Sequence, residues 1–312
     1  MQAEKHLKVE SSPFVSVIVP VFNDAKRLRL CLGALMQQTY ERDCYEIVVI
    51  DNGSDAQQDI AAVVANFAQA KYEYEAQPGS YAARNRGIER AQGDILAFTD
   101  ADCIPATDWL EKGVGHLLSI PDCGLVAGSI ELFFRGPKLS PVELYESITA
   151  FPQQLNLARY RGAATANIFT FKSVIDSVGT FNASLLSSGD IDWGERVFAA
   201  GYQQLYAEDT CVAHPARYSF EQLHQKTLRV TGGIFGRFVR PEHTALRQNM
   251  TFARLLADDF MQSVSFINNA FKDKRLVGFE QKITVSLVVI WVRCVNVTEK
   301  VRLKFGGVPH RE

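Results

Sequence analysis

The segment Ile95-Leu96-Ala97-Phe98-Thr99-Asp100-Ala101-Asp102 places two carboxylates directly after a short apolar run. A continuous apolar run of this kind is typical of a strand that is buried on both faces of a parallel sheet. In open parallel sheets, ligands bind beyond the carboxyl ends of the strands. The segment therefore predicts that Asp100 and Asp102 lie at a ligand-binding edge of such a sheet.

Two earlier segments repeat this pattern of an apolar run followed by polar residues. Residues 15–19 lead to Phe22-Asn23-Asp24, and residues 47–50 lead to Asp51-Asn52-Gly53-Ser54. Apolar residues at helical spacing lie between these runs, and strands that alternate with helices indicate βαβ units. The sequence therefore predicts an α/β fold with a Rossmann-like, mostly parallel sheet flanked by helices.

The remainder of the chain predicts a more mixed organisation. The predicted elements are strands over 124–133 and 168–171 and helices over 140–159, 190–200 and 283–301. We expect a flexible segment over 1–13, an α/β domain over 14–215 and a mainly helical region over 216–312.

Composition excludes several classes of protein. Lys and Arg number 33 against 35 Asp and Glu, so the net charge of -2 argues against a nucleic-acid binder. No G-x-G-x-x-G follows the first strand and no P-loop lysine motif occurs, which argues against dehydrogenases and P-loop enzymes. The six cysteines form no C-x-x-C pair, and the first residues lack an apolar run typical of a signal peptide. We therefore expect a cytoplasmic protein.

Two groups of charged residues are candidates for phosphate and metal binding. Asp100 and Asp102 can hold a hard divalent cation through carboxylate oxygens, although a solvated turn is the alternative. Arg84 and Arg86 lie near a predicted helix start, where an anion binds well. A pair of surface arginines is the alternative there.

Four motifs in this order resemble the family 2 glycosyltransferases of the GT-A fold. They are Val17-Ile18-Val19-Pro20-Val21-Phe22-Asn23, Val48-Val49-Ile50-Asp51-Asn52-Gly53-Ser54, Ala83-Arg84-Asn85-Arg86-Gly87 and Phe98-Thr99-Asp100-Ala101-Asp102. The resemblance continues through Val178-Gly179-Thr180-Phe181 to about His214. It covers roughly the first two thirds of the chain and implies a GT-A fold with a helical C-terminal extension. The domain over 14–215 would then be the catalytic domain, with a nucleotide-sugar half over about 14–103 and an acceptor half over about 104–215.

The resemblance implies the residues that contact a nucleotide-sugar donor. Pro20 and Phe22 would line the base pocket, and Asp51 would contact the base or the ribose. Arg84 would contact the nucleotide, and Asp100 would bind the ribose.

It also implies a divalent cation, Mn²⁺ or Mg²⁺, on the donor diphosphate. Asp102 would be the main metal ligand, and His214 would complete the site, since imidazole is an acceptable ligand for such ions. A buried, hydrogen-bonded histidine is the alternative for His214.

The candidate catalytic base lies in Gly189-Asp190-Ile191-Asp192-Trp193. Aligning the family pattern on Arg196 places Asp190 at the position of the base, with Asp192 as the rival. Gly189 replaces the usual Glu of the family, and Trp193 replaces the usual Leu. Asp192 and Trp193 are tentative acceptor contacts. A helix N-cap is the alternative role of Asp190, and a core position that of Trp193.

The resemblance implies a metal-dependent, inverting glycosyltransferase, with a hexosyl group the expected cargo. The donor would be a nucleoside-diphosphate sugar, with a UDP-sugar favoured. The acceptor would be a glycan or a lipid-linked sugar in surface polysaccharide assembly. The alternatives are a sugar nucleotidyltransferase, which normally has a Gly-rich loop after its first strand, and a catalytically silent nucleotide-binding subunit.

The last third of the chain has a basic stretch and an apolar helix. From His214 to Arg247, six Arg and Lys residues face two Glu residues, which suits an acceptor phosphate, anionic headgroups or a solvated face. Further along, apolar residues recur every three or four positions and define one helix face. They are Ile283, Leu287, Ile290, Cys294, Val297 and Val301.

This apolar face has two interpretations. The apolar run over 283–292 is shorter than the roughly 20 residues that a spanning helix needs. With basic residues around it, among them Arg293 and Lys300, the face could make peripheral contact with the inner face of the cell membrane. Alternatively, it packs on the catalytic domain or on a second subunit.

Overall fold

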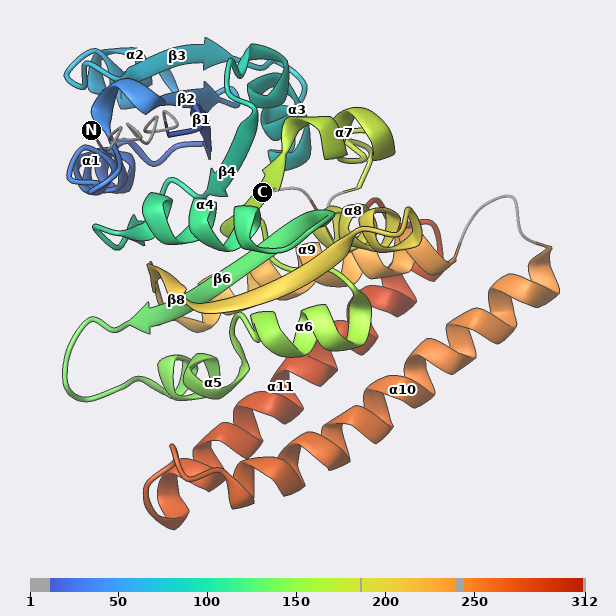
Figure 1. Cartoon of the computed structure of the whole chain (residues 1–312). Helices are drawn as coiled ribbons and strands as arrows, with labels where there is room; N and C mark the ends of the chain where they lie inside the picture. The colour runs from blue at the N-terminus through green and yellow to red at the C-terminus, as the bar shows by residue number, and fades with distance from the viewer. Residues whose placement is uncertain (1–11, 186, 240–243, 311–312) are drawn as a thin grey trace, which may run out of the picture.

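The computed structural model describes residues 12–185, 187–239 and 244–310, and within these ranges eight strands form one sheet. The strand order is β3-β2-β1-β4-β7-β6-β8-β5. The first four strands in the chain are parallel: β1 (Val15–Val21), β2 (Tyr45–Asp51), β3 (Ala70–Tyr74) and β4 (Ile95–Thr99). The predicted α/β class is confirmed (Figure 1).

The second half of the sheet is mixed in direction. Strand β7 (Asn167–Phe171) runs antiparallel between β4 and β6 (Cys123–Phe133). Strand β8 (Gln203–Pro215) is parallel to β6, and the short β5 (Ile104–Pro105) pairs antiparallel with β8. The β5–β8 pairing brings the end of β8 beside the turn that follows β4.

The register of the parallel strands gathers their polar ends at one edge. Ile18 of β1 lies opposite both Val48 of β2 and Phe98 of β4. Because the three strands run in the same direction, the residues after each strand emerge side by side. This register is the physical basis of the ligand-binding edge predicted from the sequence.

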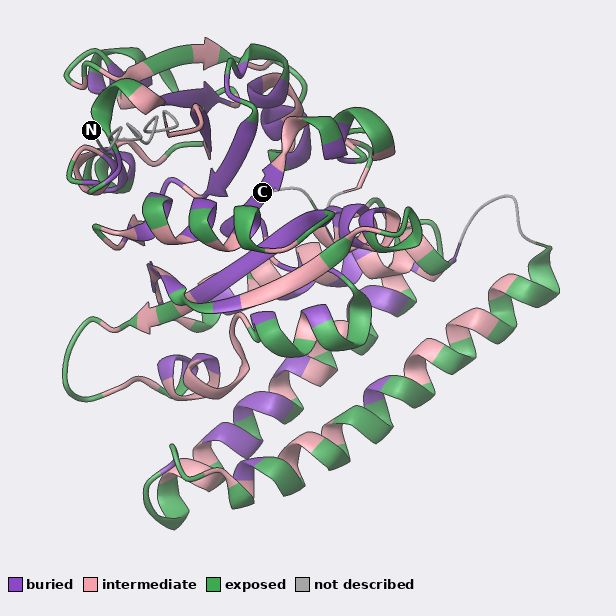
Figure 2. Cartoon of the chain, in the orientation of Figure 1, coloured by how far each residue is buried: buried purple, intermediate pink, exposed green. Residues whose placement is uncertain are grey.

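Helices cover both faces of the sheet over two buried clusters (Figure 2). One face carries α1 (Ala25–Leu35), α2 (Ile60–Val64) and α4 (Trp109–Ser119). The other face carries α3 (Ser80–Arg90), α7 (Lys172–Val178) and α8 (Gly189–Ala199). Because both faces are covered, β1, β2 and β4 are almost entirely buried, as their apolar runs indicate, whereas β3 at the edge of the sheet is largely exposed.

The single helix predicted over 140–159 is wrong. Two helices occur there, α5 (Pro141–Thr149) and α6 (Gln153–Tyr160). Pro152 separates them: it has no N–H to donate, and it disfavours a helical conformation in the residue before it. That residue, Phe151, adopts a left-handed φ of 47°.

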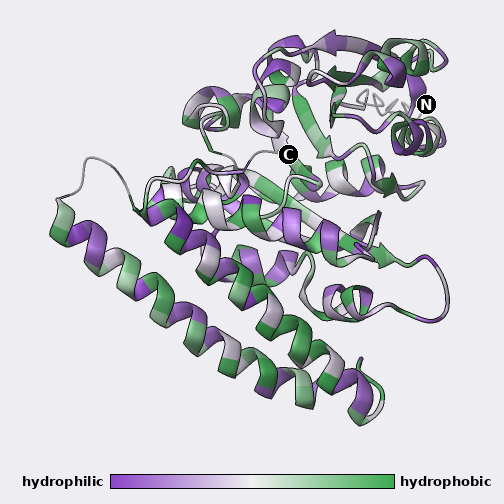
Figure 3. Ribbon diagram, turned by 180° about the vertical axis from the view of Figure 1, so that it is seen from behind, coloured by the Kyte–Doolittle hydropathy of each residue, from purple (hydrophilic) through white to green (hydrophobic). Residues whose placement is uncertain are grey.

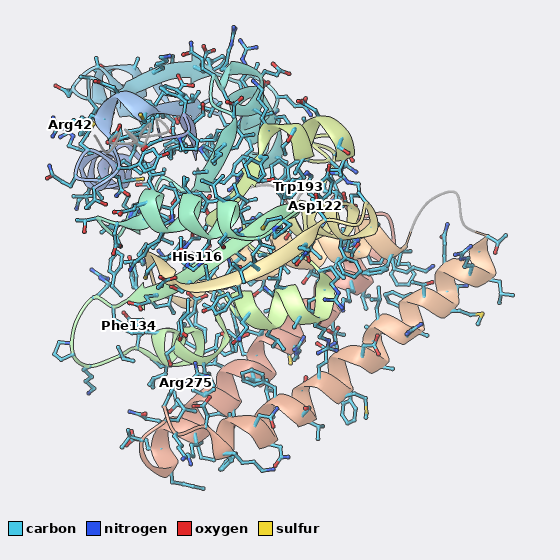
Figure 4. All side chains as sticks on the ribbon, viewed as in Figure 1. Arg42, His116, Asp122, Phe134, Trp193 and Arg275 are labelled. Carbon is cyan, nitrogen blue, oxygen red and sulfur yellow. The ribbon has the colours of Figure 1, made fainter. Side chains whose placement is uncertain are left out.

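Three helices follow the sheet: α9 (Phe220–Phe238), α10 (Ala245–Lys272) and α11 (Gly278–Lys304). Helix α11 packs on α5, α9 and α10, whereas α10 lies along α11 at the periphery (Figure 1). In the turn between α10 and α11, Arg275 donates a 3.0 Å hydrogen bond to the Ser147 carbonyl of α5 (Figure 4). The predicted helical region over 216–312 thus contains these three helices, while residues 1–11 of the predicted N-terminal segment lie outside the described ranges.

The apolar face predicted on α11 does not pack on the catalytic domain, so this part of the packing interpretation is wrong, and packing on a second subunit stays a prediction. Leu287 is 61% exposed and Ile290 is 49% exposed. The opposite face of the helix, which includes Val285, Val288 and Val289, is buried instead. Figure 3 shows hydrophobic residues along the part of α11 nearest its turn with α10. The helix is apolar on two faces, and the structure covers one of them.

The basic residues around α11 are also largely paired. Lys300 forms an ion pair with Asp259 of α10 at 2.5 Å, and Arg293 contacts the same carboxylate at 3.3 Å. Arg302 binds Glu299 at 2.7 Å. The positive charge that the sequence suggests for a membrane surface is therefore mostly neutralised within the protein.

Candidate active site

A cleft of about 790 Å³ opens at the edge where the parallel strands end. The turns after β1 and β4, the first turn of α3 and the start of α8 contribute to its walls, and so does α9. The predicted site residues that line it are Pro20, Phe22, Arg84, Asp100, Asp102, Asp190 and His214. The structure thus brings together side chains that are up to about 190 positions apart in the sequence.

Asp102 and His214 face each other across the β5–β8 pairing. The Nε2 atom of His214 lies 3.4 Å from Oδ1 of Asp102. The Nδ1 atom of His214 lies 2.8 Å from the carbonyl of Pro215, and an N–H at Nδ1 donates to that acceptor. This tautomer leaves the Nε2 lone pair directed toward Asp102, the arrangement in which a histidine binds a metal.

The donor set suits a hard divalent cation. Ligand atoms of Asp102, Cys103 and His214 lie within 4.8 Å of one another. Burial raises the pKa of the Cys103 thiol well above its usual range, so the thiol stays protonated and is a poor ligand. A carboxylate oxygen and an imidazole nitrogen remain, and both are accepted by Mn²⁺-like ions. The residues present therefore fit the predicted cation.

On the donor side, Arg84 holds Asp100. The Arg84 side chain is 5% exposed, and its Nη2 forms a short ion pair with Oδ1 of Asp100. Phe22 is 46% exposed at the mouth of the cleft. Arg84 therefore fixes the orientation of Asp100, and its own contact with the nucleotide stays a prediction.

Asp51 lies apart from the cleft lining. Its Oδ1 accepts a 2.9 Å hydrogen bond from the Ser54 amide, and its Oδ2 accepts one of 3.2 Å from the Tyr72 hydroxyl. The neighbouring Asn52 lines the cleft and holds the Gly79 amide through its Oδ1 at 2.7 Å. The predicted contact of Asp51 with the base or ribose stays a prediction, and Asn52 is a lining residue that the sequence motifs contained but did not single out.

Asp190 lies at the start of α8 and faces the cleft. Its Oδ1 accepts hydrogen bonds from the Tyr81 hydroxyl at 3.2 Å and from the Ile191 amide at 2.9 Å. Burial raises the pKa of the Asp190 carboxyl, although the Ile191 amide and Arg84 partly oppose this effect. A carboxylate with a raised pKa is a better proton acceptor than an ordinary aspartate.

The glycine at 189 has a structural explanation. A Cβ at this position would lie 2.7 Å from the Tyr81 ring, so the site has no room for a glutamate. The Gly189 amide also donates to the Tyr81 hydroxyl oxygen at 2.9 Å. Tyr81 therefore positions the start of α8 and the Asp190 carboxyl together. From the sequence alone, Tyr81 is an aromatic residue that either stacks on a sugar or lies in the core, and its only positional signal is its place three residues before Arg84.

The structure contradicts Trp193 as an acceptor contact and argues against Asp192. Trp193 is 0% exposed, packs among buried residues of α3, α7 and α8, and donates from Nε1 to the Gly179 carbonyl at 3.1 Å (Figure 4). Asp192 is outside the cleft lining and pairs with Arg196 at 3.4 Å. Positions 190 and 192 differ by about 200° around a helix, so only one of the two can face the cleft. The core alternative for Trp193 is thus the correct one.

Replacing Tyr81 tests the link between this side chain and Asp190. The hydroxyl donates to the carboxylate and so lowers the pKa of Asp190, and Tyr81→Phe removes that contribution. The pKa of Asp190 then rises, a larger fraction is protonated at a given pH, and the acidic limb of the kcat/KM profile moves to higher pH. At neutral pH we expect a loss of activity within about tenfold.

The control is Tyr160→Phe, which removes a hydroxyl from an exposed tyrosine outside the cleft lining. Its acidic limb should match that of the wild-type protein. An unmoved acidic limb in Tyr81→Phe would show that Asp190 is not the group that titrates in the activity profile.

The chain is similar in sequence to known glycosyltransferases. The sequence model of Glycosyl transferase family 2 matches residues 16–176. The chain is 40% identical to glycosyltransferase AglE of Haloferax volcanii over 227 residues, which cover 71% of this chain and 73% of that protein. It is 28% identical to the pre-mycofactocin glycosyltransferase of Mycobacterium tuberculosis, covering 65% of this chain and 43% of that protein.

A solved structure has the same fold. It is the mannosyltransferase PcManGT from Pyrobaculum calidifontis in complex with GDP-Man and Mn²⁺. The TM-score is 0.60, the identity is 18%, and the match covers 94% of this chain and 89% of that one. The predicted GT-A type of fold, including the C-terminal helices, is therefore confirmed.

Proposed function

This chain belongs to glycosyl transferase family 2, and from that premise we propose an inverting, metal-dependent transfer of a hexosyl group from a nucleoside-diphosphate sugar. The observation that carries the proposal is the convergence of Asp102, His214 and Asp190 on one cleft. A silent binding subunit has no need of a pKa-shifted carboxylate opposite a metal-type donor pair, so the convergence supports an enzyme.

We assign the chemistry to groups on two walls of the cleft. Asp190 accepts the proton of the attacking acceptor hydroxyl, and its raised pKa makes it suited to that task. Asp102 and His214 hold the divalent cation, which when bound supplies charge neutralisation for the leaving diphosphate. A single displacement with one base inverts the anomeric centre, and the geometry at Asp190 supports this mechanism.

The donor side points to a nucleotide. Asp100, held by Arg84, is placed to accept hydrogen bonds from ribose hydroxyls, and Pro20 and Phe22 offer apolar surface to a base. We favour a UDP-sugar. GDP-mannose is the alternative because the mannosyltransferase of the same fold binds it.

A screen of donor hydrolysis tests the proposal. The full chain is incubated with UDP-glucose, UDP-galactose, UDP-N-acetylglucosamine and GDP-mannose, each with Mn²⁺, with Mg²⁺ and with a chelator. We expect slow, cation-dependent release of the nucleoside diphosphate from one donor. Cation-independent release, or no binding of any nucleotide, would contradict the proposal.

We place the acceptor among glycans or lipid-linked sugars in surface polysaccharide assembly, with the protein in the cytoplasm at the inner face of the membrane. The exposed apolar face of α11 supports peripheral contact with lipid, because the protein leaves its apolar side chains uncovered. Within the described residues, α11 is also long and apolar enough to span a membrane, by length and composition alone. The neighbouring apolar pocket, lined by Phe220, Leu287 and Trp291, extends this surface.

Vesicle binding tests the membrane contact. Since Arg293, Lys300 and Arg302 are paired, we expect binding driven by apolar burial: the chain co-sediments with neutral phosphatidylcholine vesicles, and high salt changes this little. The variant Leu287→Gln/Ile290→Gln replaces two exposed residues and should weaken binding by at least about tenfold, because each loses about 1.5–3 kcal/mol of burial.

A substitution of one exposed polar residue on the same helix provides the control. Glu280 is exposed in the first turn of the same helix, and Glu280→Gln should leave binding to neutral vesicles unchanged. A chain that stays in the supernatant with every vesicle, or that forms a dimer through the apolar face of α11 instead, would contradict the membrane contact.

A further inference from the structure

The cleft has a basic wall that the proposed chemistry does not use. Arg217, Lys226 and Arg229 line it, on α9 and on the turn before it. They lie in the same cleft as Asp102 and Asp190, but on a different element from the strand ends that would hold the nucleotide. The wall therefore adds positive charge beside the reacting groups.

A buried carboxylate fixes two of these cations. Glu146 of α5 has a side chain that is 0% exposed, and its Oε1 lies 2.8 Å from Nζ of Lys226 and 3.2 Å from Nη1 of Arg217. Its Oε2 accepts the Arg217 backbone amide at 2.9 Å. Burial disfavours a charged Glu146, but Lys226 and Arg217 outweigh it and lower the pKa of the carboxyl. Glu146 thus stays ionised and holds both cations in place.

Arg217 and Lys226 retain N–H groups that are available to bind a ligand. The Arg217 side chain is 22% exposed and the Lys226 side chain is 28% exposed, and both line the cleft. Among the described residues, the Lys226 ammonium has Glu146 as its one hydrogen-bond partner, so two of its three N–H groups are available. Burial, followed by the charge of Arg217, lowers the pKa of Lys226 to about 8. A bound anion would stabilise the charged ammonium and so offset the effects of burial and of the Arg217 charge.

The balance of charge favours an anion. Arg217 and Lys226 together face the single Glu146 carboxylate, so this pair keeps a net positive charge. Glu221, the other acid on this wall, is exposed and accepts a hydrogen bond from Gln225 at 2.9 Å. A phosphate group carries close to two negative charges at neutral pH and offers three acceptor oxygens, which suit a planar guanidinium and an ammonium together.

The position of α9 relates this wall to the acceptor. Gly233 allows α9 to approach the turn before Asp190, because a Cβ there would lie 2.7 Å from the Cβ of Ser187. The helix therefore runs from the vicinity of His214 to the turn that carries the candidate base. An anion bound by Lys226 would lie between these two points, where an acceptor has to enter.

We propose that Arg217, Lys226 and Arg229 form a subsite for a phosphate group carried by the acceptor. This inference rests on the proposed glycosyltransferase reaction, since it assigns the acceptor wall of the same cleft. The phosphate belongs either to a lipid phosphate or to a phosphorylated sugar, and both share the chemistry that the subsite recognises.

Calorimetry on the full chain tests the subsite with three probes: inorganic phosphate, glucose 1-phosphate and dodecyl phosphate below its micellar concentration. The variant is Lys226→Gln, and Lys226→Arg is the matched control that retains the charge. Loss of one charged hydrogen-bonding group should weaken binding of the preferred probe by about tenfold or more, whereas Lys226→Arg should stay within about threefold of the wild type. Tighter binding of dodecyl phosphate assigns a lipid source, and tighter binding of glucose 1-phosphate assigns a phosphorylated sugar.

A second variant guards against misfolding. Arg229→Gln leaves Glu146, Arg217 and Lys226 intact and should also weaken the preferred probe. Unchanged affinity for every probe in both variants overturns the proposal.

Binding of UDP and GDP with Mn²⁺ is measured in the same samples. If Lys226→Gln weakens nucleotide binding as strongly as phosphate binding, the wall serves the donor diphosphate and the proposal is overturned. If the wild type binds a phosphate probe but no nucleotide, the proposed donor reaction fails and the subsite stands by itself.

Discussion

Replacing Asp190 by Asn lowers turnover by about two to four orders of magnitude, the usual contribution of a general base, and leaves donor affinity nearly unchanged. The substitution preserves shape but removes proton acceptance. Both hydrogen bonds to Oδ1, from the Tyr81 hydroxyl and the Ile191 amide, can be retained by an amide oxygen. Single-turnover kinetics with a saturating donor, together with a donor binding assay, separates the two quantities.

The matched control is Asp192→Asn on the same helix. Asp192 pairs with Arg196, which in turn donates to the Thr180 carbonyl at 2.7 Å, so its role is to hold a loop. We expect a change in activity within about threefold, in line with the small value of a partly exposed ion pair. A large loss in Asp192→Asn with an active Asp190→Asn would reverse the assignment of the base.

The pH profile provides a second check on Asp190. Burial raises the pKa of its carboxyl, and the carboxyl must be ionised to accept a proton. The rate therefore falls as pH drops through this raised pKa, at a higher pH than an ordinary aspartate would give. Asp190→Asn should abolish this acidic limb in the residual activity.

The parallel half of the fold follows directly from the sequence. Residues 15–19, 47–50 and 95–98 are buried almost completely, and an apolar run without alternation predicts that environment. The mixed half is harder to predict, because the insertion of β7 between β4 and β6 depends on pairing between distant segments. Strand β5 has two residues, which is too short for any periodic pattern. Helix α4 has no counterpart among the predicted elements, although Trp109, Val114 and Leu117 lie on its buried side.

The site was partly predictable for a similar reason. The carboxylates after β4 are recognisable because a strand end determines where they emerge. The choice between Asp190 and Asp192 depends on which side of α8 faces the cleft, and a two-residue spacing alone does not decide it. Packing decides it: Trp193 fills the core beneath α8, and this orientation directs Asp190 outward.

The sequence pattern of α11 is compatible with burial of either of two helix faces. Residues of α11 at spacings of three and four define an apolar face, but the alternate positions 285, 288, 289 and 292 are apolar as well. Burial of either face satisfies the pattern. The contacts of α5 and α9 select the second face, which leaves the predicted face exposed.

Replacing Asp102 by Ala abolishes the cation dependence of nucleotide binding. Asp102 is the carboxylate that His214 faces, at 3.4 Å, and the Cys103 thiol is too weak an acid to take its place. Loss of a partner that merely orients a metal ligand already costs about 10–100-fold in metal affinity, so loss of the ligand itself should cost at least as much. Calorimetry of UDP and of GDP, with and without Mn²⁺, measures the effect independently of turnover.

The control for this variant is Asp108→Ala. Asp108 is an aspartate six positions along the chain that pairs with Lys112 at 2.8 Å and stays outside the cleft lining. Its nucleotide affinity should gain as much from Mn²⁺ as that of the wild type, because no group near the cation has changed. If Mn²⁺ still raises the nucleotide affinity of Asp102→Ala as much as that of the wild type, then His214 and Asp100 hold the cation without Asp102. The assignment of Asp102 as the main ligand is then wrong. If His214→Ala removes the effect of Mn²⁺ on nucleotide affinity whereas Asp102→Ala does not, the imidazole is the dominant ligand. Asp102 then serves to orient the imidazole through the 3.4 Å contact.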